Sequence, residues 1–261
     1  MGDATDDSQG KLTLYTNYGC PWAHRAHITL RELDLSYDET IIDLEKPREE
    51  WYLKINDRGL VPTIQHSHPS LPSSGPVTVI ESALVVQYLI DAFPHLSGHV
   101  LPAAKDAKSA YDRYTINLLT DIWFNKVNSF WFKALLMAGT DEAISKADEL
   151  FNAMKTQFEP KLADALGKTG SGPFIGGAER MTLFEILVAP FVLRIHDFSN
   201  SEDQVHPSSL AANLNSLPAY GQWSKAVVAQ ESVTYIWNKE KMIESMVRRL
   251  PEMRKKYGAA K

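Results

Sequence analysis

The chain has 261 residues, 44% of them hydrophobic and 23% charged, and its 27 Lys and Arg against 32 Asp and Glu give a net charge of −5. These fractions are ordinary for a soluble globular protein and exclude a collagen-like, disordered or low-complexity chain. The acidic balance argues against nucleic acid as the main partner. At roughly 150 residues per domain, the length predicts one large domain or two modest ones.

The first 95 residues alternate between short strand patterns and short helix patterns. In chain order we expect a strand around Leu12 to Tyr15, a helix over 23–33, a strand over 36–42, a helix over 47–55 opened by Pro47, strands over 63–65 and 77–80, and a helix capped by Ser82. The predicted order is therefore βαβαββα. A long loop rich in Pro, Ser and Gly joins the last two strands.

After Phe93 the strand patterns nearly vanish and helical periodicity takes over. It covers residues 104–137, 141–166, 182–196 and 217–230, and a last amphipathic segment around 243–253, with breaks at 139–140, 167–177 and 199–209. We therefore expect a flexible N-terminus over 1–10, an α/β domain over 11–95, a linker over 96–103 and an all-helical domain over 104–261.

The cysteine count is unusual, because the whole chain contains only Cys20. One cysteine can form neither an intrachain disulfide nor a multi-cysteine zinc site. His24 and His27 stand three apart on a predicted helix with no third ligand near them, so no metal site is predicted. No signal-peptide pattern and no run of about 18 apolar residues is present. We expect a cytoplasmic protein with no membrane contact.

Cys20 follows a predicted strand and opens a predicted helix. Unpaired backbone N–H groups and the helix dipole at this position favour the thiolate over the thiol, and Pro21 suits a first helical turn. The alternative is that a lone cysteine is a small buried hydrophobe. The fourth residue of the segment is Ala23, not a second cysteine, so any redox chemistry there needs an external thiol.

Two further patterns fit a ligand site beside Cys20. Val61-Pro62 precedes a strand, where a cis peptide would turn the Val61 backbone outward to pair with a peptide ligand. Glu81-Ser82 stands at a strand-to-helix junction, where Ser82 would hold a ligand carboxylate and Glu81 an ammonium group. The structural alternatives are a trans-proline turn and a plain helix cap.

Taken together, these motifs resemble the cytosolic glutathione transferases, and the Cys-Pro-Trp-Ala-His-Arg segment over 20–25 resembles above all the cysteine-type omega class and its fungal omega-like relatives. The resemblance implies a thioredoxin-like domain followed by the family's all-helical domain, with glutathione as co-substrate and a homodimer as assembly. It also implies that Thr182 and Glu185 form the family's helix-capping box, a structural feature.

The resemblance also implies roles for individual residues. Cys20 would be the catalytic thiol, Val61 with Pro62 the backbone partner of the cysteinyl part, and Glu81 with Ser82 the partners of the γ-glutamyl end. Lys46 would approach the glycine carboxylate, with Arg48 as the alternative. Trp22 would lie on the glutathione side, and the candidates for a hydrophobic co-substrate pocket between the domains are Tyr18, Trp123, Phe130 and Trp223.

The function expected on this basis is glutathione-dependent thiol transfer or reduction through a mixed disulfide between Cys20 and glutathione. Deglutathionylation, reduction of dehydroascorbate and removal of glutathione from aryl-ketone conjugates all fit that cycle. One alternative is a non-catalytic carrier of hydrophobic aromatic small molecules. A simple monothiol glutaredoxin is another, but it gives no role to the helical half.

Overall fold

The computed structural model describes residues 9–72, 75–167, 172–200 and 205–257, so most of the predicted flexible N-terminus lies outside the described residues. The chain forms two compact units, residues 1–97 and 98–261. The first has the element order β1 (Lys11–Thr16), α1 (Pro21–Glu32), β2 (Asp38–Ile41), α2 (Glu50–Leu53), β3 (Thr63–Ser67), β4 (Val77–Ile80) and α3 (Ser82–Ala92). The predicted βαβαββα order is confirmed.

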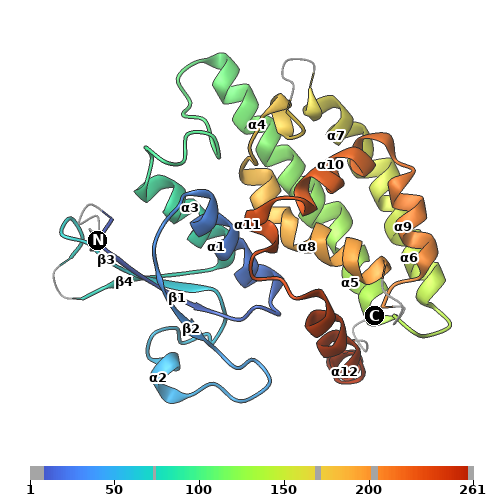
Figure 1. Ribbon diagram of the computed structural model, residues 1–261, viewed down its shortest axis with the longest axis horizontal. Coiled ribbons are helices and arrows are strands. Elements are labelled where there is room, and N and C mark those ends of the chain that lie inside the picture. The colour runs from blue at the N-terminus through green and yellow to red at the C-terminus, as the bar shows by residue number, and fades with distance from the viewer. Residues whose placement is uncertain (1–8, 73–74, 168–171, 201–204, 258–261) are drawn as a thin grey trace. The chain divides into compact units, whose positions relative to one another are not determined.

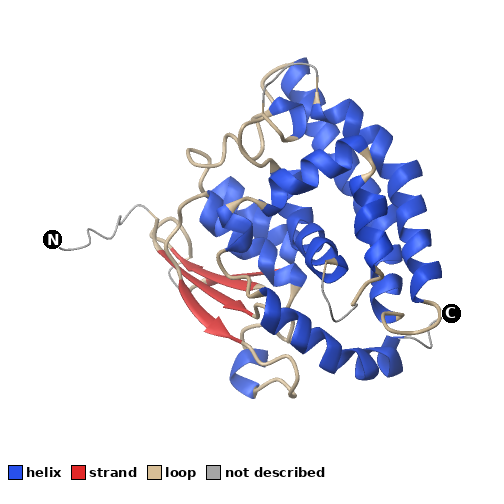
Figure 2. Ribbon diagram, turned by 45° about the vertical axis from the view of Figure 1, so that its right-hand side comes forward, coloured by secondary structure: helices blue, strands red, loops and turns tan. Residues whose placement is uncertain are grey.

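The four strands form one sheet in the order β2-β1-β3-β4. Strand β2 runs parallel to β1, whereas β3 is antiparallel to both β1 and β4. Helices α1 and α3 pack against each other, and α2 lies apart from that pair (Figure 1). Figure 2 shows the same sheet with its strands in red. Strand β1 lies between β2 and β3 inside the sheet. The loop after β1 therefore leaves the sheet between its neighbouring strands, at the end where β1 finishes.

Helix α1 has a sharply defined start and end. Cys20 has an extended backbone conformation as N-cap and Pro21 occupies the first helical position. At the other end Asp34 has a φ of 51°, and the N–H groups of Asp34 and Leu35 donate to the carbonyls of Arg31 and Leu30. This pair of bonds is the Schellman arrangement, here with Asp where Gly is more common.

Helix α2 is shorter than the predicted helix over 47–55, and the prediction that Pro47 opens it was wrong. Glu49, not Pro47, is the N-cap residue. The preceding segment is held out of helical geometry by Arg48, whose guanidinium donates to the carbonyls of Asp43 (2.6 Å), Lys46 and Gly59 (2.9 Å). Proline also disfavours the helical conformation for the residue before it.

In the described part of the second unit, the regular elements are all helices, and one isolated β-bridge joins Phe174 and Ala178. Its helices are α4 (Ala107–Ile122), α5 (Asn128–Leu136), α6 (Ala143–Ala153), α7 (Glu159–Leu166), α8 (Leu183–Ser199), α9 (Ser208–Asn215), α10 (Pro218–Val228), α11 (Glu231–Thr234) and α12 (Lys239–Tyr257), with a 3₁₀ turn at Ile175–Gly177. The predicted breaks at 139–140 and 167–177 fall between helices, although residues 168–171 are outside the described part.

Two predictions for this unit need correction. The segment 199–209 was predicted as a break, but its last two residues belong to α9. Only Leu210 and Leu214 of this helix are buried, so its sequence shows little apolar periodicity. The long helix over 104–137 is interrupted by a π-helical turn at Trp123–Val127, and a second π turn at Met154–Phe158 separates α6 from α7. Each π turn contains about one more residue than an α-helical turn, so the side chains that follow it face a different direction.

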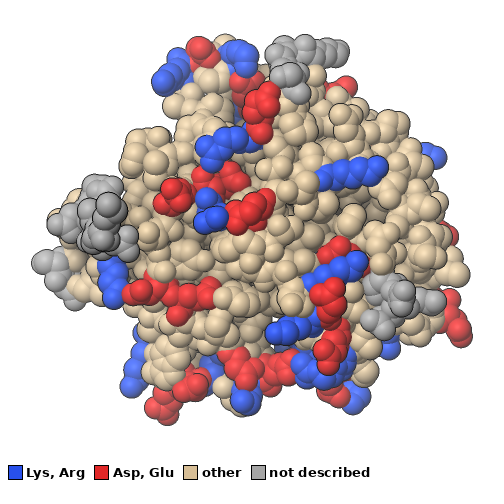
Figure 3. Space-filling view, in the orientation of Figure 1, with Lys and Arg blue, Asp and Glu red and all other residues tan. Residues whose placement is uncertain are grey.

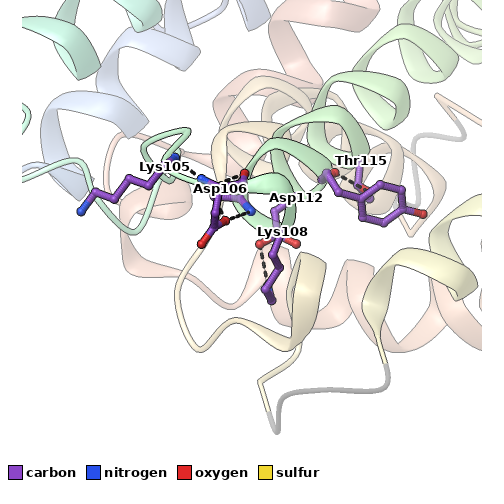
Figure 4. Close-up of polar contacts among 7 residues, drawn as sticks. Lys105, Asp106, Lys108, Asp112 and Thr115 are labelled. Carbon is purple, nitrogen blue, oxygen red and sulfur yellow. Dashed lines mark hydrogen bonds and ion pairs between the residues drawn. The ribbon is translucent and has the colours of Figure 1, made fainter.

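Capping boxes fix the starts of helices α4 and α8. At α4 the Asp106 carboxylate accepts from the Ser109 N–H (2.8 Å) and the Ser109 hydroxyl accepts from the Asp106 N–H (3.0 Å); Figure 4 shows this turn. At α8 Thr182 and Glu185 form a capping box, as the sequence predicts. Helix α8 is almost wholly buried and is the centre of the helical core.

Acidic and basic side chains are mixed over the face drawn in Figure 3, as the near balance of 27 basic and 32 acidic residues implies. No helix in the described parts of the chain is long and apolar enough to cross a membrane.

His206 makes the stability of the helical unit depend on pH. It lies in the core beside Phe198, neither ring nitrogen has a hydrogen-bond partner, and burial lowers its pKa from 6.5 to about 4. Below pH 6.5 the unfolded chain therefore binds a proton that the folded chain rejects. We expect His206 to cost about 2 kcal/mol of unfolding free energy between pH 7 and pH 5.

Urea unfolding followed by tryptophan fluorescence at the two pH values measures this cost. His206→Leu should reduce the wild-type difference between the two pH values by about 2 kcal/mol, whereas replacement of the exposed His95 by leucine should leave that difference unchanged. An unchanged pH difference in His206→Leu would show that other groups carry it. His27 has its pKa lowered to about 4 by burial as well, so the first unit should lose stability in the same direction.

Candidate active site

Cys20 is held at the centre of one sheet edge by the loop that follows β1. The Asn17 side chain accepts from the Gly19 N–H (3.0 Å) and donates to the carbonyl of Ile42 (2.9 Å), while the Cys20 N–H donates to the Asn17 carbonyl (3.0 Å). These bonds fasten the loop to the end of β2. The thiol is thus fixed at the first turn of α1, where unpaired N–H groups favour an anion.

The thiol is half-buried against an apolar cluster. Cys20 packs on Tyr15, Ala23, Ile42, Tyr52 and Val61, and its Sγ lies 4.0 Å from the carbonyl oxygen of Val61. The Val61–Pro62 peptide is cis. The structure therefore places the sequence's Val-Pro motif beside the cysteine, with the Val61 backbone at the thiol.

A buried arginine lies near the thiol, five residues further along the chain. Arg25 is 3% exposed, its Nη1 donates to the Ser82 hydroxyl (2.9 Å), and its guanidinium lies 4.5 Å from the centre of the Trp22 ring. Burial lowers the pKa of Arg25 to about 9, and attraction to the Cys20 thiolate opposes that decrease. The guanidinium and the Cys20 sulfur are therefore close enough to interact electrostatically.

Glu81 and Ser82 stand at the start of α3, close to this arginine. Ser82 is the first residue of the helix, and Glu81 before it has a φ of 68°, a region that residues other than glycine rarely occupy. The half-exposed Glu81 carboxylate is paired with Arg58. A ligand ammonium at Glu81 would therefore share the carboxylate with Arg58.

Lys46 and Arg48 differ in what their charges already contact. Arg48 is bonded to several backbone carbonyls of its own loop and of Gly59, so it braces the loop. Lys46 is exposed, and its ammonium pairs with Asp43 at 3.1 Å on the surface. Of the two, Lys46 is the side chain with the freedom to meet a ligand carboxylate.

Tyr18 and Trp22 flank the cysteine in the sequence and are both partly exposed. The Tyr18 hydroxyl donates to the Glu39 carboxylate, and this bond raises the pKa of Tyr18 to about 12. The Tyr18 hydroxyl hydrogen is therefore used in the bond to Glu39. Trp22, 39% exposed, covers the Arg25 guanidinium.

Two of the predicted co-substrate residues lie in the helical core. Trp123 is 0% exposed and packs edge-on against Phe158 at 5.2 Å between ring centres. Trp223, also 0% exposed, stacks on Phe184 at 5.6 Å, and its indole N–H donates to Glu185. Their expected pocket role is corrected to a core role, because the aromatic partners of both rings belong to the same unit. Phe130 is half-buried.

The two histidines of α1, His24 and His27, are both buried. The His27 ring is hydrogen-bonded with the hydroxyls of Thr16 (2.8 Å) and Tyr37 (3.2 Å). Within the described residues, no three His, Cys, Asp or Glu side chains are grouped to hold a metal ion.

Residues 19–92 match the glutathione S-transferase N-terminal domain family. The chain is 35% identical over 95 residues to pyrimidodiazepine synthase of Drosophila melanogaster, a match that spans 36% of each chain. It is 24% identical over 199 residues to the probable glutathione transferase omega-2 of Caenorhabditis elegans, covering 73% of this chain and 72% of that one. Residues 19–92 thus belong to the glutathione S-transferase N-terminal domain family, and the chain is similar to omega-class glutathione transferases.

Solved structures agree on the fold. Glutathione transferase Omega 1C from Trametes versicolor superposes with a TM-score of 0.73 at 24% identity, over 94% of this chain and 98% of that one. The thioredoxin-like sheet followed by helices is thus the glutathione transferase architecture, as the motifs predict. The Drosophila match is confined to about a third of that enzyme's length.

Three residues of the candidate site are not indicated by the sequence patterns. Asn17 fastens the cysteine loop, Arg25 is buried between Trp22 and Ser82, and Arg58 pairs with Glu81. Asn17 carries a turn signal in the sequence, since asparagine side chains often accept from an N–H two residues on. Arg25 carries no such signal, because a charged residue at a helical position is exposed in most proteins.

Proposed function

We propose that this protein is a glutathione-dependent thiol transferase whose nucleophile is Cys20. The observation that carries the proposal is the position of a half-buried thiol at the N-cap of α1, beside the Val61 carbonyl and under the influence of the Arg25 charge. A thiolate is the nucleophile in disulfide exchange, and reactive cysteines are typically found at helix N-termini and beside cations.

The proposed cycle has two exchange steps. The Cys20 thiolate attacks the glutathionyl sulfur of a mixed disulfide, the original S–S bond breaks, and the substrate thiolate leaves and takes up a proton. The thiolate of a second glutathione then attacks the disulfide between Cys20 and glutathione, which releases oxidised glutathione and restores the Cys20 thiolate. The resolving thiol must be external, because the chain has no other cysteine.

In the proposed complex each end of glutathione meets a separate group. The Val61 backbone, next to Pro62, would pair with the cysteinyl part, Ser82 would accept the γ-glutamyl carboxylate and Glu81 its ammonium. Lys46 would meet the glycine carboxylate, since Arg48 is bound to its own loop. Trp22 would border the same site.

The same cycle would support deglutathionylation, reduction of dehydroascorbate and removal of glutathione from aryl-ketone conjugates. The carrier alternative draws on Trp123, Phe130 and Trp223, and two of these are core residues. We therefore favour the enzyme. A cytoplasmic location and a homodimer are part of the proposal, and gel filtration with light scattering tests the dimer.

Intact-mass measurement after incubation with oxidised glutathione tests the proposal directly. We expect one glutathionyl adduct per chain, reversed by excess reduced glutathione and missing in Cys20→Ser. Alkylation by iodoacetamide in a parallel sample shows whether the thiol is accessible. A chain that is alkylated completely but never forms the glutathionyl adduct would contradict the proposed function.

A further inference from the structure

Arg25 is a buried cation that contacts two parts of the proposed site. It belongs to the second turn of α1, is 3% exposed and is covered on one side by the Trp22 ring at 4.5 Å. Its Nη1 reaches across to Ser82 at the start of α3, 57 residues away in the sequence. A charge at this depth depends on the polar groups and charges close to it, so the groups that Arg25 contacts indicate its role.

The direction of the bond to Ser82 indicates what that explanation is. Arg25 Nη1 donates and the Ser82 oxygen accepts, at 2.9 Å. With its oxygen held in this way, the hydroxyl keeps its own hydrogen for another acceptor. Ser82 stands in the first turn of α3, where backbone N–H groups without helical partners also favour an anion.

We infer that Arg25 is the positioning residue of the carboxylate subsite: its buried guanidinium orients the Ser82 hydroxyl toward the γ-glutamyl carboxylate of the ligand and supplies the positive charge that this carboxylate meets. The inference rests on the proposed function and names the group that selects γ-glutamyl thiols. The same cation attracts the Cys20 thiolate, so one residue serves both anions of the site.

The test uses ligands that cannot undergo thiol chemistry. S-methylglutathione has the γ-glutamyl carboxylate, and S-methylcysteinylglycine lacks it. We expect the wild type to bind the first more tightly, and Arg25→Met to weaken that binding about 10- to 100-fold, the range for one hydrogen bond to a charged group. Binding of S-methylcysteinylglycine should change little. Isothermal titration calorimetry measures both dissociation constants.

Four further variants separate a positioning role from a purely structural one. Ser82→Ala should weaken the binding of S-methylglutathione by a similar factor. The Arg25→Met, Ser82→Ala double variant should bind it little more weakly than Arg25→Met alone, because both substitutions remove the same contact. Arg25→Lys keeps the charge but lacks the guanidinium fork, so it should lose ligand discrimination and yet keep the iodoacetamide rate of Cys20 near neutral pH. Arg31→Met, an exposed position on the same helix, should match the wild type.

The outcomes are distinct from those of the glutathionyl adduct experiment. The inference is overturned if Arg25→Met or Arg25→Lys discriminates between the two ligands as well as the wild type does, even when the Cys20 adduct forms normally. It is equally overturned if the wild type shows no preference for S-methylglutathione. A missing adduct alongside a preference that depends on Arg25 would overturn the thiol-transfer chemistry and leave the carboxylate subsite in place.

Discussion

Cys20→Ser is expected to lower the rate of glutathione-dependent reduction of a small mixed disulfide by at least about 100-fold. A serine hydroxyl stays protonated near neutral pH, so neither the N-terminus of α1 nor the Arg25 charge can convert it into a comparable nucleophile. Initial rates at several disulfide concentrations, with glutathione in excess, measure kcat/KM for the two proteins.

The interpretation depends on the variant keeping its ligand site. Binding of S-methylglutathione should be within a few-fold of the wild type, because the contacts proposed for it come from Val61, Glu81, Ser82 and Lys46. A serine variant that reduces the disulfide at the wild-type rate would rule out the Cys20 mechanism. Loss of both reduction and ligand binding would instead indicate that the substitution disturbed the loop fastened by Asn17.

Removal of the Glu185 carboxylate is expected to lower the free energy of unfolding strongly. Glu185 is 0% exposed and lies in the centre of the helical unit. It accepts from the N–H and hydroxyl of Thr182 (2.9 and 2.5 Å), the N–H of Ile175 (3.1 Å) and the indole N–H of Trp223 (3.1 Å). Glu185→Ala would leave three buried N–H donors without their acceptor. At about 1–3 kcal/mol for each, we expect a loss of about 4 kcal/mol or more in unfolding free energy.

Urea unfolding of Glu185→Ala and Glu185→Asp measures this loss. The aspartate variant keeps a carboxylate for the cap at Thr182 but is one methylene too short to reach Ile175 and Trp223 as well, so its loss should be intermediate. Glu244→Ala, an exposed site on α12, should stay within about 0.5 kcal/mol of the wild type. An alanine variant as stable as that control would show that the buried network contributes little.

The parts of the site that could be predicted from the sequence are those fixed by local rules. A proline after Cys20, a proline after Val61 and a serine after Glu81 each constrain the backbone at their own position, so the helix start, the turn and the cap follow from neighbouring residues. The capping box at Thr182 is of the same kind. Such patterns need no knowledge of what packs nearby.

What the sequence could not predict depends on contacts between distant residues. Arg25 and Ser82 are 57 positions apart, and only the packing of α1 on α3 brings them together. Trp123 and Trp223 were expected to line a pocket, yet a π turn at Trp123 and the carboxylate of Glu185 place both rings in the core. Periodicity alone cannot show an inserted residue.

The bond between Tyr18 and Glu39 bears on how this site can change over evolutionary time. A phenol can donate a hydrogen bond to a sulfur anion, and Tyr18 stands two residues before Cys20. Here the phenol already gives its hydrogen to a carboxylate, and its pKa of about 12 leaves it too weak an acid to stabilise a neighbouring sulfur anion. A mutation that removed Cys20 would thus leave Tyr18 unable to take over until Glu39 also changed. At least two substitutions therefore separate this site from one that uses Tyr18, and a single mutation at Cys20 would leave the site without a group to replace the thiol.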